Sequence, residues 1–453
     1  MRLTKRAKWC FGIGAIGKDA ICNLVGIFLM VYITDILKLS PAYAGALFFV
    51  ARIWDAVNDP AMGMIVDNTR SKFGKFRPWI FIGTVLNAVV IVFLFRKPDL
   101  EGLPLYVYFS IMYILWGMTY TIMDIPYWSM IPALTSSKEE REQVAVIPRI
   151  FASTAWLIMG TFGLSIVKKL GNGNVVKGYS SFAVVIAVAF IISAIITCLN
   201  VKERVETPKN AEKVSFKQTL NIIRKNDQLL VFIGIVLGMN LIMQISGSMA
   251  IYYFTYVVGK ENLFSVYQAF AGIAEISGLV LLPILTKKIG REDVFKFGSI
   301  LPIAGFLLLF IAGIVAPQNA LFIGMAGAIL KLGSGFLLGS TTIMLADVVD
   351  YGEFKLGTRN ESIVFSVQTL LVKGASAVAG WLVGVGLSLV GYVAGEVQSA
   401  TTILGMRVIM IWIPIVCAIV MYTIYKSKYK INGKFHDDML VELEKRKKAN
   451  DAI

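Results

Sequence analysis

The chain has 453 residues, of which 57% are hydrophobic and 16% are charged, and its formal net charge is +15. A soluble domain carries about 25% charged residues, so this composition excludes an ordinary soluble protein and predicts an all-α polytopic membrane protein. The single histidine, His436, and four cysteines without paired spacing exclude histidine-based acid–base catalysis, a disulfide framework and a cysteine metal cluster, so no enzyme is expected.

Twelve apolar segments are long enough to cross a bilayer. They lie at about 9–36, 41–66, 78–95, 103–133, 146–167, 180–200, 229–257, 264–286, 297–316, 319–349, 362–392 and 402–425. The loops between them are short except for 201–228, which is polar and charged. This division predicts an N-terminal six-helix half, a cytoplasmic linker, a C-terminal six-helix half and a basic cytoplasmic tail, at 1–200, 201–228, 229–425 and 426–453.

The basic residues predict the orientation. With both termini in the cytoplasm, 31 of the 44 lysines and arginines fall on the inside and seven on the outside. The inner set would face anionic lipids of the cytoplasmic leaflet, which explains the net charge without a nucleic-acid partner. We therefore expect a multi-pass protein of the bacterial cytoplasmic (inner) membrane, with the lipid bilayer as its surroundings and no nucleic acid.

The first segment contains GIGAIGKD at 12–19, which matches two nucleotide-binding patterns, GxGxxG and GxxxxGK. No strand precedes it, and Asp19 stands where a phosphate-binding loop needs Ser or Thr. Nucleotide binding is therefore not expected. The small residues favour close helix packing, followed by a charged pair, Lys18 and Asp19, that faces a polar cavity.

The second segment carries charges near its middle, in ALFFVARIWDAVNDPAMGMIVD at 46–67. A helix places Asp55 and Asp59 on one face, where each costs about 2.5–3.5 kcal/mol in hydrocarbon. With Asn58 they form an oxygen-rich group that suits a hard cation or a proton, and not zinc or copper. The alternative is an internal i,i+3 ion pair between Arg52 and Asp55, but one arginine cannot neutralise two aspartates.

The fourth segment places Tyr120, Asp124 and Trp128 at i, i+4 and i+8, on one helix face. Sugar recognition uses this combination, because a carboxylate accepts hydrogen bonds from hydroxyls while an aromatic ring covers the apolar face of the sugar. Thr121, next to that face, could offer its hydroxyl to a cation. The alternative is an aromatic belt at the membrane interface, which does not explain Asp124 in the middle of the segment.

Further charges occur in later segments. Arg149 opens the fifth segment and Lys373 lies within the eleventh, where they would balance Asp19 and Asp124. Snorkelling to the interface is the alternative, and it suits Arg149 better than Lys373. Glu275 and Lys331 are expected to pair within the C-terminal half in a structural role.

The stretch DVVDYGEFKLGTRNES at 347–362 follows the tenth segment on the inner side. Its acidic residues Asp347 and Asp350 could meet Arg141 and Lys138, closing the inner side in one state and opening it in another. An ordinary solvated loop is an equally good interpretation of the spacing.

Long strings along the whole chain resemble one family. They are FGIGAIGKD (11–19), ARIWDAVNDP (51–60), GKFRPW (74–79), YILWGMTYTIMDIP (113–126), YYFTYVVG (252–259), DVVDYGEFKL (347–356) and SVQTLLVKG (366–374). They resemble the glycoside–pentoside–hexuronide:cation symporters of the major facilitator superfamily. The resemblance implies twelve transmembrane helices in two six-helix halves and sugar uptake coupled to Na⁺, Li⁺ or H⁺, without another cofactor.

The resemblance also implies roles for particular residues. The cation site would comprise Asp55, Asn58, Asp59 and Thr121. The sugar site and its lining would comprise Lys18, Asp19, Tyr120, Asp124, Trp128, Arg149, Gln368, Thr369 and Lys373. The inner gate would comprise Arg141, Asp347, Asp350 and Arg359.

The expected function is alternating-access symport of a melibiose-like α-galactoside with a monovalent cation, by a chain that is functional as a monomer. A same-family symporter for a β-galactoside, pentoside or glucuronide is the first alternative, and a non-transporting sugar sensor or a membrane enzyme are alternatives of other classes. Leu338 stands where the galactoside carrier of the family that the sequence resembles has tryptophan. The sequence therefore leaves the exact sugar open. It also leaves open the physiological cation, the oligomeric state, the preferred conformation and the regulation.

Overall fold

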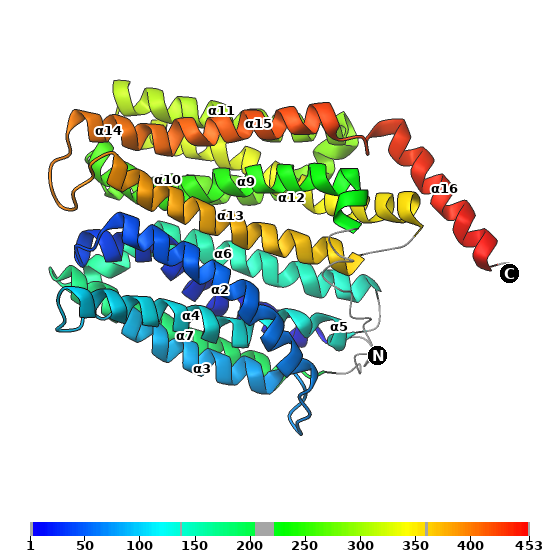
Figure 1. Ribbon diagram of the computed structural model, residues 1–453, viewed down its shortest axis with the longest axis horizontal. Helices are drawn as coiled ribbons and strands as arrows, with labels where there is room; N and C mark the ends of the chain where they lie inside the picture. Colours follow the sequence, from blue (N-terminus) through cyan, green and yellow to red (C-terminus); the bar gives the residue numbers. More distant parts are fainter. Residues whose placement is uncertain (1–2, 136–137, 204–221, 358–360, 452–453) are drawn as a thin grey trace. The chain divides into compact units, whose positions relative to one another are not determined.

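The computed structural model describes residues 3–135, 138–203, 222–357 and 361–451, and every regular element in these ranges is a helix (Figure 1). Eleven helical stretches of the described part are long and apolar enough to cross a membrane. Nine of the helices involved are α1 (Lys5–Asn23), α3 (Arg77–Leu94), α4 (Leu103–Ser129), α6 (Lys138–Gly171), α7 (Val175–Asn200), α9 (Asp227–Tyr252), α10 (Asn262–Ile289), α11 (Arg291–Val315) and α12 (Ala320–Leu356). The other two stretches are formed by α13 (Glu361–Leu389), and by α14 (Ala400–Arg407) with α15 (Ile413–Lys428). The prediction of an all-α membrane protein is thereby confirmed.

The described residues contain further elements. Turns of π-helix occur at η1 (Leu24–Leu29), η2 (Tyr32–Ile36), η3 (Tyr253–Val257) and η4 (Val408–Trp412), and further α-helices are α2 (Pro41–Asp67), α5 (Ile131–Leu134) and α16 (Gly433–Asp451). The eleven stretches do not include α2, a helix of 27 residues that carries Arg52, Asp55 and Asp59. The number of twelve spans therefore stays a prediction.

The chain divides into two compact units. Unit 1 comprises Met1–Asn210 and Gly380–Thr402, and unit 2 comprises Ala211–Ala379 and Ile403–Ile453. Within unit 1, α1 packs on α6 and α7, α3 on α4 and α7, and α2 on α4. Within unit 2, α12 packs on α10, α11 and α16, and α15 packs on α9 and α11.

The GIGAIGKD stretch lies within α1 and packs as the sequence predicts. A methyl group on Gly17 would lie 2.0 Å from Ser193 Oγ and 2.9 Å from Phe190 Cα of α7. A methyl group on Gly12 would meet the Phe151 ring of α6 at 2.7 Å. These positions admit only hydrogen, so the glycines serve helix packing, and Lys18 and Asp19 are brought close to the helices around α1.

The stretch 347–356 corrects one interpretation. Helix α12 continues to Leu356 and ends at Gly357, whose φ is +71°. Asp347 and Asp350 therefore lie on a helix and not in a solvated loop. The reason is that this segment forms intrahelical hydrogen bonds until a glycine in the left-handed region terminates them.

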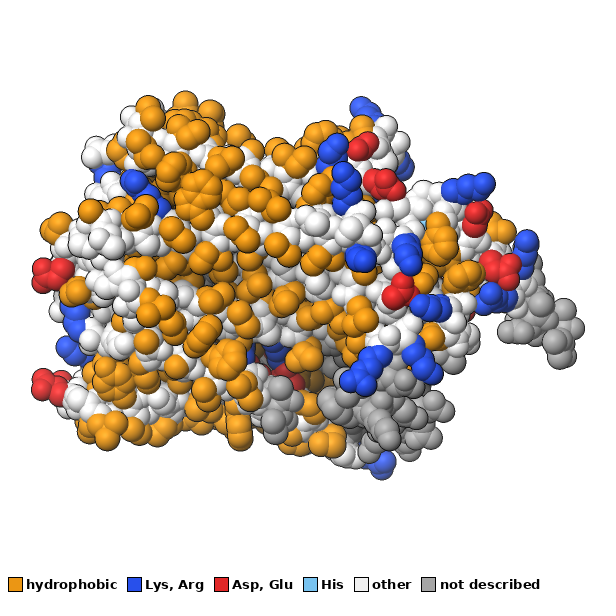
Figure 2. Space-filling view, turned by 45° about the horizontal axis from the view of Figure 1, so that its top comes forward, with side chains coloured by type: hydrophobic (Ala, Val, Ile, Leu, Met, Phe, Trp, Pro, Cys, Tyr) orange, Lys and Arg blue, Asp and Glu red, His pale blue; other side chains and the backbone are white. Residues whose placement is uncertain are grey.

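The surface has the composition that a bilayer requires. In Figure 2 hydrophobic side chains cover most of the face shown, and charged side chains gather near the ends of the helices, above all at the end that carries α16. Large apolar side chains such as Leu199, Val280 and Val315 are exposed along the helices. Exposure on this scale fits contact with lipid.

Candidate functional site

A buried lysine lies at the centre of the candidate site in unit 1. Only 4% of Lys18 is exposed. Its Nζ lies 2.9 Å from Asp124 Oδ1 and 3.5 Å from Asp19 Oδ1, and it donates a hydrogen bond to the Tyr120 hydroxyl at 3.3 Å. The ammonium group of Lys18 thus lies between two carboxylates, and a buried charge requires such pairing.

Aromatic rings surround the same lysine. Its Nζ lies 5.1 Å from the centre of the Trp128 ring, 5.7 Å from that of Tyr120 and 5.9 Å from that of Tyr127. The Trp128 indole donates to Asp124 Oδ1 at 3.1 Å. The predicted shared face of Tyr120, Asp124 and Trp128 is therefore confirmed, and it faces α1.

The cluster has spare hydrogen-bonding capacity. Asp19 Oδ2 is buried and accepts no hydrogen bond from the described residues. Since a buried carboxylate oxygen without a donor is costly, this atom would gain from a ligand hydroxyl. Carboxylate acceptors, a lysine donor and flat rings together can bind a polyhydroxylated ligand.

The second predicted group lies between α2 and α4. Thr121 Oγ1 donates to Asp59 Oδ1 at 3.0 Å, and a methyl group on Gly117 would lie 3.2 Å from Asp55 Oδ1. Asp55 is 5% exposed, and the buried Asn58 Nδ2 has no hydrogen-bond partner among the described residues. The oxygens of these side chains suit a small hard cation or a proton.

The ion pair between Arg52 and Asp55, which the sequence offers as an alternative interpretation of these charges, also forms within α2. Arg52 Nη1 lies 2.8 Å from Asp55 Oδ2, which leaves Oδ1 of the same carboxylate toward Gly117. Asp59 has Thr121 as a neighbour instead. The pair therefore involves Asp55 of the two aspartates. Among the described residues, no group of three or more His, Cys, Asp or Glu side chains that could hold a metal ion occurs.

The other predicted sugar-site residues are distributed over both units. Arg149 is exposed on α6 in unit 1, and Gln368, Thr369 and Lys373 lie on α13 in the part that belongs to unit 2. Gln368 and Lys373 are half-buried and Thr369 is exposed. Their roles stay predictions.

The structure describes the side chains of two of the four predicted inner-gate residues, Asp347 and Asp350. The side chain of Arg141 and all of Arg359 lie outside the described residues. Asp347 of α12 is buried and meets two other groups, Arg291 Nη1 and His436 Nε2, each at 3.3 Å. Asp350 lies one turn further along α12 and is half-buried.

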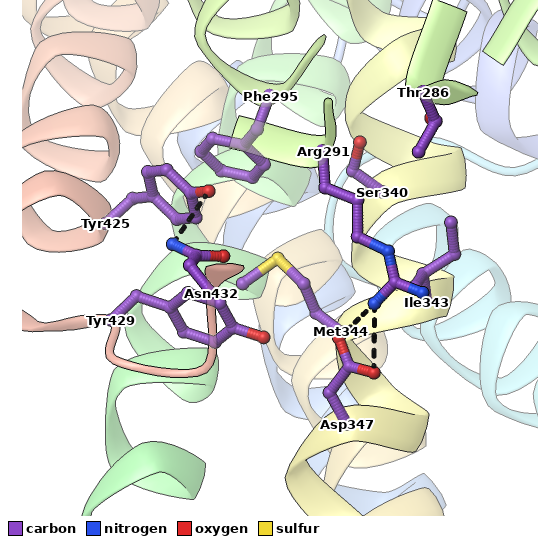
Figure 3. A pocket seen from close by; sticks show the side chains of 10 residues that line it. All are labelled: Thr286, Arg291, Phe295, Ser340, Ile343, Met344, Asp347, Tyr425, Tyr429 and Asn432. Carbon is purple, nitrogen blue, oxygen red and sulfur yellow. Dashed lines mark hydrogen bonds and ion pairs between the residues drawn. The ribbon is translucent and has the colours of Figure 1, made fainter. Parts of the chain in front are cut away.

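A cavity beside Asp347 is lined by polar side chains that include Thr286, Ser340 and Asn432 (Figure 3). Its volume is about 20 Å³, which is room for about one water molecule. Burial, with Asp347 close by, raises the pKa of the Tyr429 phenol in its wall. The cavity is too small for a sugar, so it belongs to the packing around Asp347.

The predicted ion pair of unit 2 is also present. Lys331 Nζ donates to Glu275 Oε2 at 2.8 Å, between α12 and α10. Sequence reasoning missed Gly117, although its position four residues before Thr121 places it on the same face. It also missed the contact of Asp347 with Arg291 and His436, for which the sequence offers no local signal.

Comparison with known proteins gives a consistent result. A family model described as MFS/sugar transport protein matches residues 10–433. The isoprimeverose transporter of Lactiplantibacillus pentosus is 32% identical over 443 residues, which cover 96% of this chain and 91% of that protein. The raffinose carrier protein of Pediococcus pentosaceus is 28% identical over 466 residues, which cover 96% of this chain and 71% of that protein.

A solved structure shares the fold. The crystal structure of a bacterial homolog to the human lysosomal transporter Spinster aligns with a TM-score of 0.72 at 13% identity, covering 96% of this chain and 100% of that one. At this identity the likeness concerns the fold alone.

Proposed function

We propose a coupled transport mechanism for this chain, which belongs to the MFS/sugar transport protein family and is a multi-pass protein of the bacterial inner membrane. The mechanism is secondary active symport, in which sugar uptake is driven by Na⁺, Li⁺ or H⁺ through alternating access. One observation gives this mechanism its main support. Helix α4 presents Thr121 to Asp59 on one side and the neighbouring Tyr120 to Lys18 on the other, so both candidate ligand groups share one helix.

The cation is the first ligand in this mechanism. Bound at Asp55 and Asp59, with the Thr121 hydroxyl as a neutral ligand, it would offset negative charge that is costly inside a membrane. Because Gly117 and Thr121 stand on α4, cation binding would hold that helix in a fixed position. Asp124 and Tyr120 on the same helix would then be aligned toward Lys18.

The sugar is the second ligand, and its hydroxyls would bond to Asp19 and Asp124. An α-galactoside is our first choice, because the sequence strings resemble the melibiose carrier and because a raffinose carrier protein is among the relatives. Leu338 in place of tryptophan weakens this choice. The isoprimeverose transporter favours a pentoside as the second candidate.

The first experiment uses de-energised cells in nominally Na⁺-free buffer. Melibiose is added while external pH and external Na⁺ are recorded, with and without a few millimolar Na⁺. Sugar-evoked Na⁺ uptake is the expected result. Alkalinisation alone would assign proton coupling to the same site.

The same experiment is repeated with raffinose and isoprimeverose. A signal with isoprimeverose alone would replace the galactoside by a pentoside. No ion movement with any sugar, in cells shown to contain the protein, would contradict symport. Failure to accumulate sugar against a gradient despite sugar binding would favour a sensor, and chemically altered sugar inside the cells would favour an enzyme.

A further inference from the structure

The accessible side of the first membrane segment continues beyond Lys18 and its partners. Asp19 and Asn23 are half-buried and Gly26 is exposed, whereas residues between them, such as Ala20 and Leu24, are buried. Asp19 and Asn23 are four residues apart in α1, so they share one face of the helix. Asn23 therefore lies on the side of α1 that carries the candidate sugar site.

Asn23 differs from other asparagines of the membrane segments in its hydrogen bonds. Asn87 of α3 donates to the Trp116 carbonyl at 2.9 Å, and Asn240 of α9 donates to the Val236 carbonyl at 2.8 Å. The side chain of Asn23 makes no cap hydrogen bond at the start of η1 and bonds to none of the described residues. Hydrocarbon offers an amide no partner, so asparagines in membrane segments bond to neighbouring helices. The amide of Asn23 is therefore available to a ligand.

The neighbours of Asn23 place its amide beside the candidate sugar site. Cys22, the preceding residue, interacts with Tyr120 of α4, whose hydroxyl accepts a hydrogen bond from Lys18. One turn earlier, Asp19 Oδ2 is buried without a donor among the described residues. Asn23 lies about 6 Å further along α1 than Asp19, which is roughly the length of one sugar ring.

Gly26 leaves space one turn beyond this amide. An added methyl group on Gly26 would meet no atom within 4 Å, whereas one on Gly17 of the same helix would lie 2.0 Å from Ser193 Oγ. Gly26 is therefore not required for helix packing. It lies in η1, a π-helical stretch, and such stretches are frequent at functional sites. The missing side chain keeps room for part of a ligand.

A neutral disaccharide fits this arrangement. The carboxylates, the ammonium group and the rings around Lys18 provide for one sugar ring. Two carboxylates against one ammonium group leave a negative charge there, which disfavours an acidic sugar such as a glucuronide. The amide of Asn23 adds an acceptor oxygen and two donor hydrogens. Vicinal hydroxyls of a second ring supply the matching donors and acceptors.

We propose that Asn23 is a further sugar-binding residue, which bonds to the second ring of a neutral disaccharide, and that Gly26 leaves the room for that ring. The inference rests on the proposed function, because it names the substrate class of the same site. Asn23 and Gly26 then distinguish disaccharides from simple glycosides, whereas the residues around Lys18 bind both.

Paired ligands test this subsite. The affinities of the purified protein for melibiose and for methyl α-galactoside are measured by calorimetry in saturating Na⁺, with isoprimeverose and methyl α-xyloside as a second pair. Asn23→Leu should weaken binding of the disaccharide by about tenfold, because one or two hydrogen bonds are lost, and should change the affinity for the methyl glycoside by less than about twofold. Asn200→Leu is the matched control, since Asn200 is half-buried on α7 and its amide already bonds to the Ile196 carbonyl.

Filling the space at Gly26 gives a second and independent measurement. Gly26→Leu adds a side chain where an added methyl group meets no atom, so the helix accommodates it while the room for the second ring is lost. Affinity for the disaccharide should fall by about tenfold or more, with affinity for the methyl glycoside retained. Gly63→Leu on α2 is the control, because an added methyl group there also meets nothing within 4 Å. Thermal unfolding in detergent confirms that each variant is folded.

The outcomes separate the subsite from the transport function. Equal weakening of the disaccharide and the methyl glycoside by Asn23→Leu would overturn the subsite, and so would an unchanged affinity for the disaccharide in both variants. Binding is read without transport. A chain that binds the disaccharide with the expected dependence on Asn23, yet moves no ion with it, would refute symport and leave the subsite standing.

Discussion

At the scale of single residues, the candidate site depends on a few charges whose partners are fixed. Lys18 is buried between two carboxylates, and Oδ2 of one of them, Asp19, accepts no hydrogen bond from the described residues. Asp55 and Asp59 have different neighbours. Asp55 pairs with Arg52, whereas Asp59 accepts a hydrogen bond from Thr121. Substitutions at these positions therefore separate sugar binding from cation binding.

Asp124→Asn should weaken sugar binding by about 100-fold, because it removes a charge-assisted acceptor and leaves Lys18 with one carboxylate partner. Sugar affinity is measured by calorimetry on purified protein in saturating cation. Asp293→Asn, at an exposed position in the first turn of α11, is the matched control. An unchanged affinity in Asp124→Asn would remove this residue from the sugar site.

Asp59→Cys should keep sugar binding and lose its stimulation by Na⁺, because the variant lacks a cation ligand while the Lys18 cluster is untouched. The measurement is sugar affinity with and without Na⁺. A full Na⁺ effect in the variant would contradict the assignment of the cation site.

At the scale of helices, packing and capping position these residues. Helices α10 and α12 approach closely at Gly335, whose added methyl group would lie 2.4 Å from the Glu275 carbonyl oxygen. The Glu275–Lys331 pair lies at this contact. At the start of α3, the Glu203 carboxylate accepts from the backbone N–H groups of Lys75 and Phe76 at 2.7 and 2.8 Å, and from that of Arg77, the first residue of the helix, at 3.4 Å.

Reversing the charges of Glu275 and Lys331 tests the contact between α10 and α12. Glu275→Lys or Lys331→Glu alone should lower the free energy of unfolding by about 3–5 kcal/mol, since each places two like charges where an ion pair now forms. The double reversal should recover much of this loss. Thermal unfolding in detergent measures the effect. Additive losses in the double variant would mean that the pair has no structural role.

Removing the cap tests the second contact. Glu203→Ala should cost about 1–2 kcal/mol, because the N–H groups of Lys75 and Phe76, directly before α3, and of Arg77, its first residue, lose their acceptor. Glu101→Ala, at an exposed position, provides the comparison in the same thermal unfolding assay. Equal stabilities for the two variants would show that the carboxylate is dispensable for α3.

At the scale of the whole molecule, the candidate cation and sugar groups are linked through one helix. Because α4 contacts Asp59 through Thr121 and Lys18 through Tyr120, we propose that a ligand in one group would change the position of the other. Such linkage is reciprocal by thermodynamic necessity. It is therefore a property of the chain as a whole and not of either site.

The factor by which Na⁺ raises sugar affinity should equal the factor by which sugar raises Na⁺ affinity, and a factor of about 5–150 is expected for coupled sites. Calorimetric titrations in both orders measure the two factors. A factor of one in both orders would mean that the sites are independent, and the role assigned to α4 would then be wrong.

The sequence by itself determined the class of protein, the helices and the local side-chain patterns. Hydropathy and periodicity depend on neighbours in the chain, so they predicted the apolar segments and the shared face of Tyr120, Asp124 and Trp128. They offered the Arg52–Asp55 pair only as the alternative to a cation site, and the pair forms. They also predicted that GIGAIGKD is a packing surface. The pairing of Glu275 with Lys331 was predicted because unpaired charges are rare in membrane segments.

Only the tertiary structure decided which distant residues meet. Lys18 and Asp124 are far apart in the chain, as are Asp59 and Thr121, and no local pattern specifies their contact. The same holds for Asp347, which meets Arg291 and His436, and for residues 380–402, which belong to unit 1 although both flanking segments belong to unit 2. The physical reason is that periodicity fixes the face on which a side chain lies, whereas helix packing chooses what that face contacts.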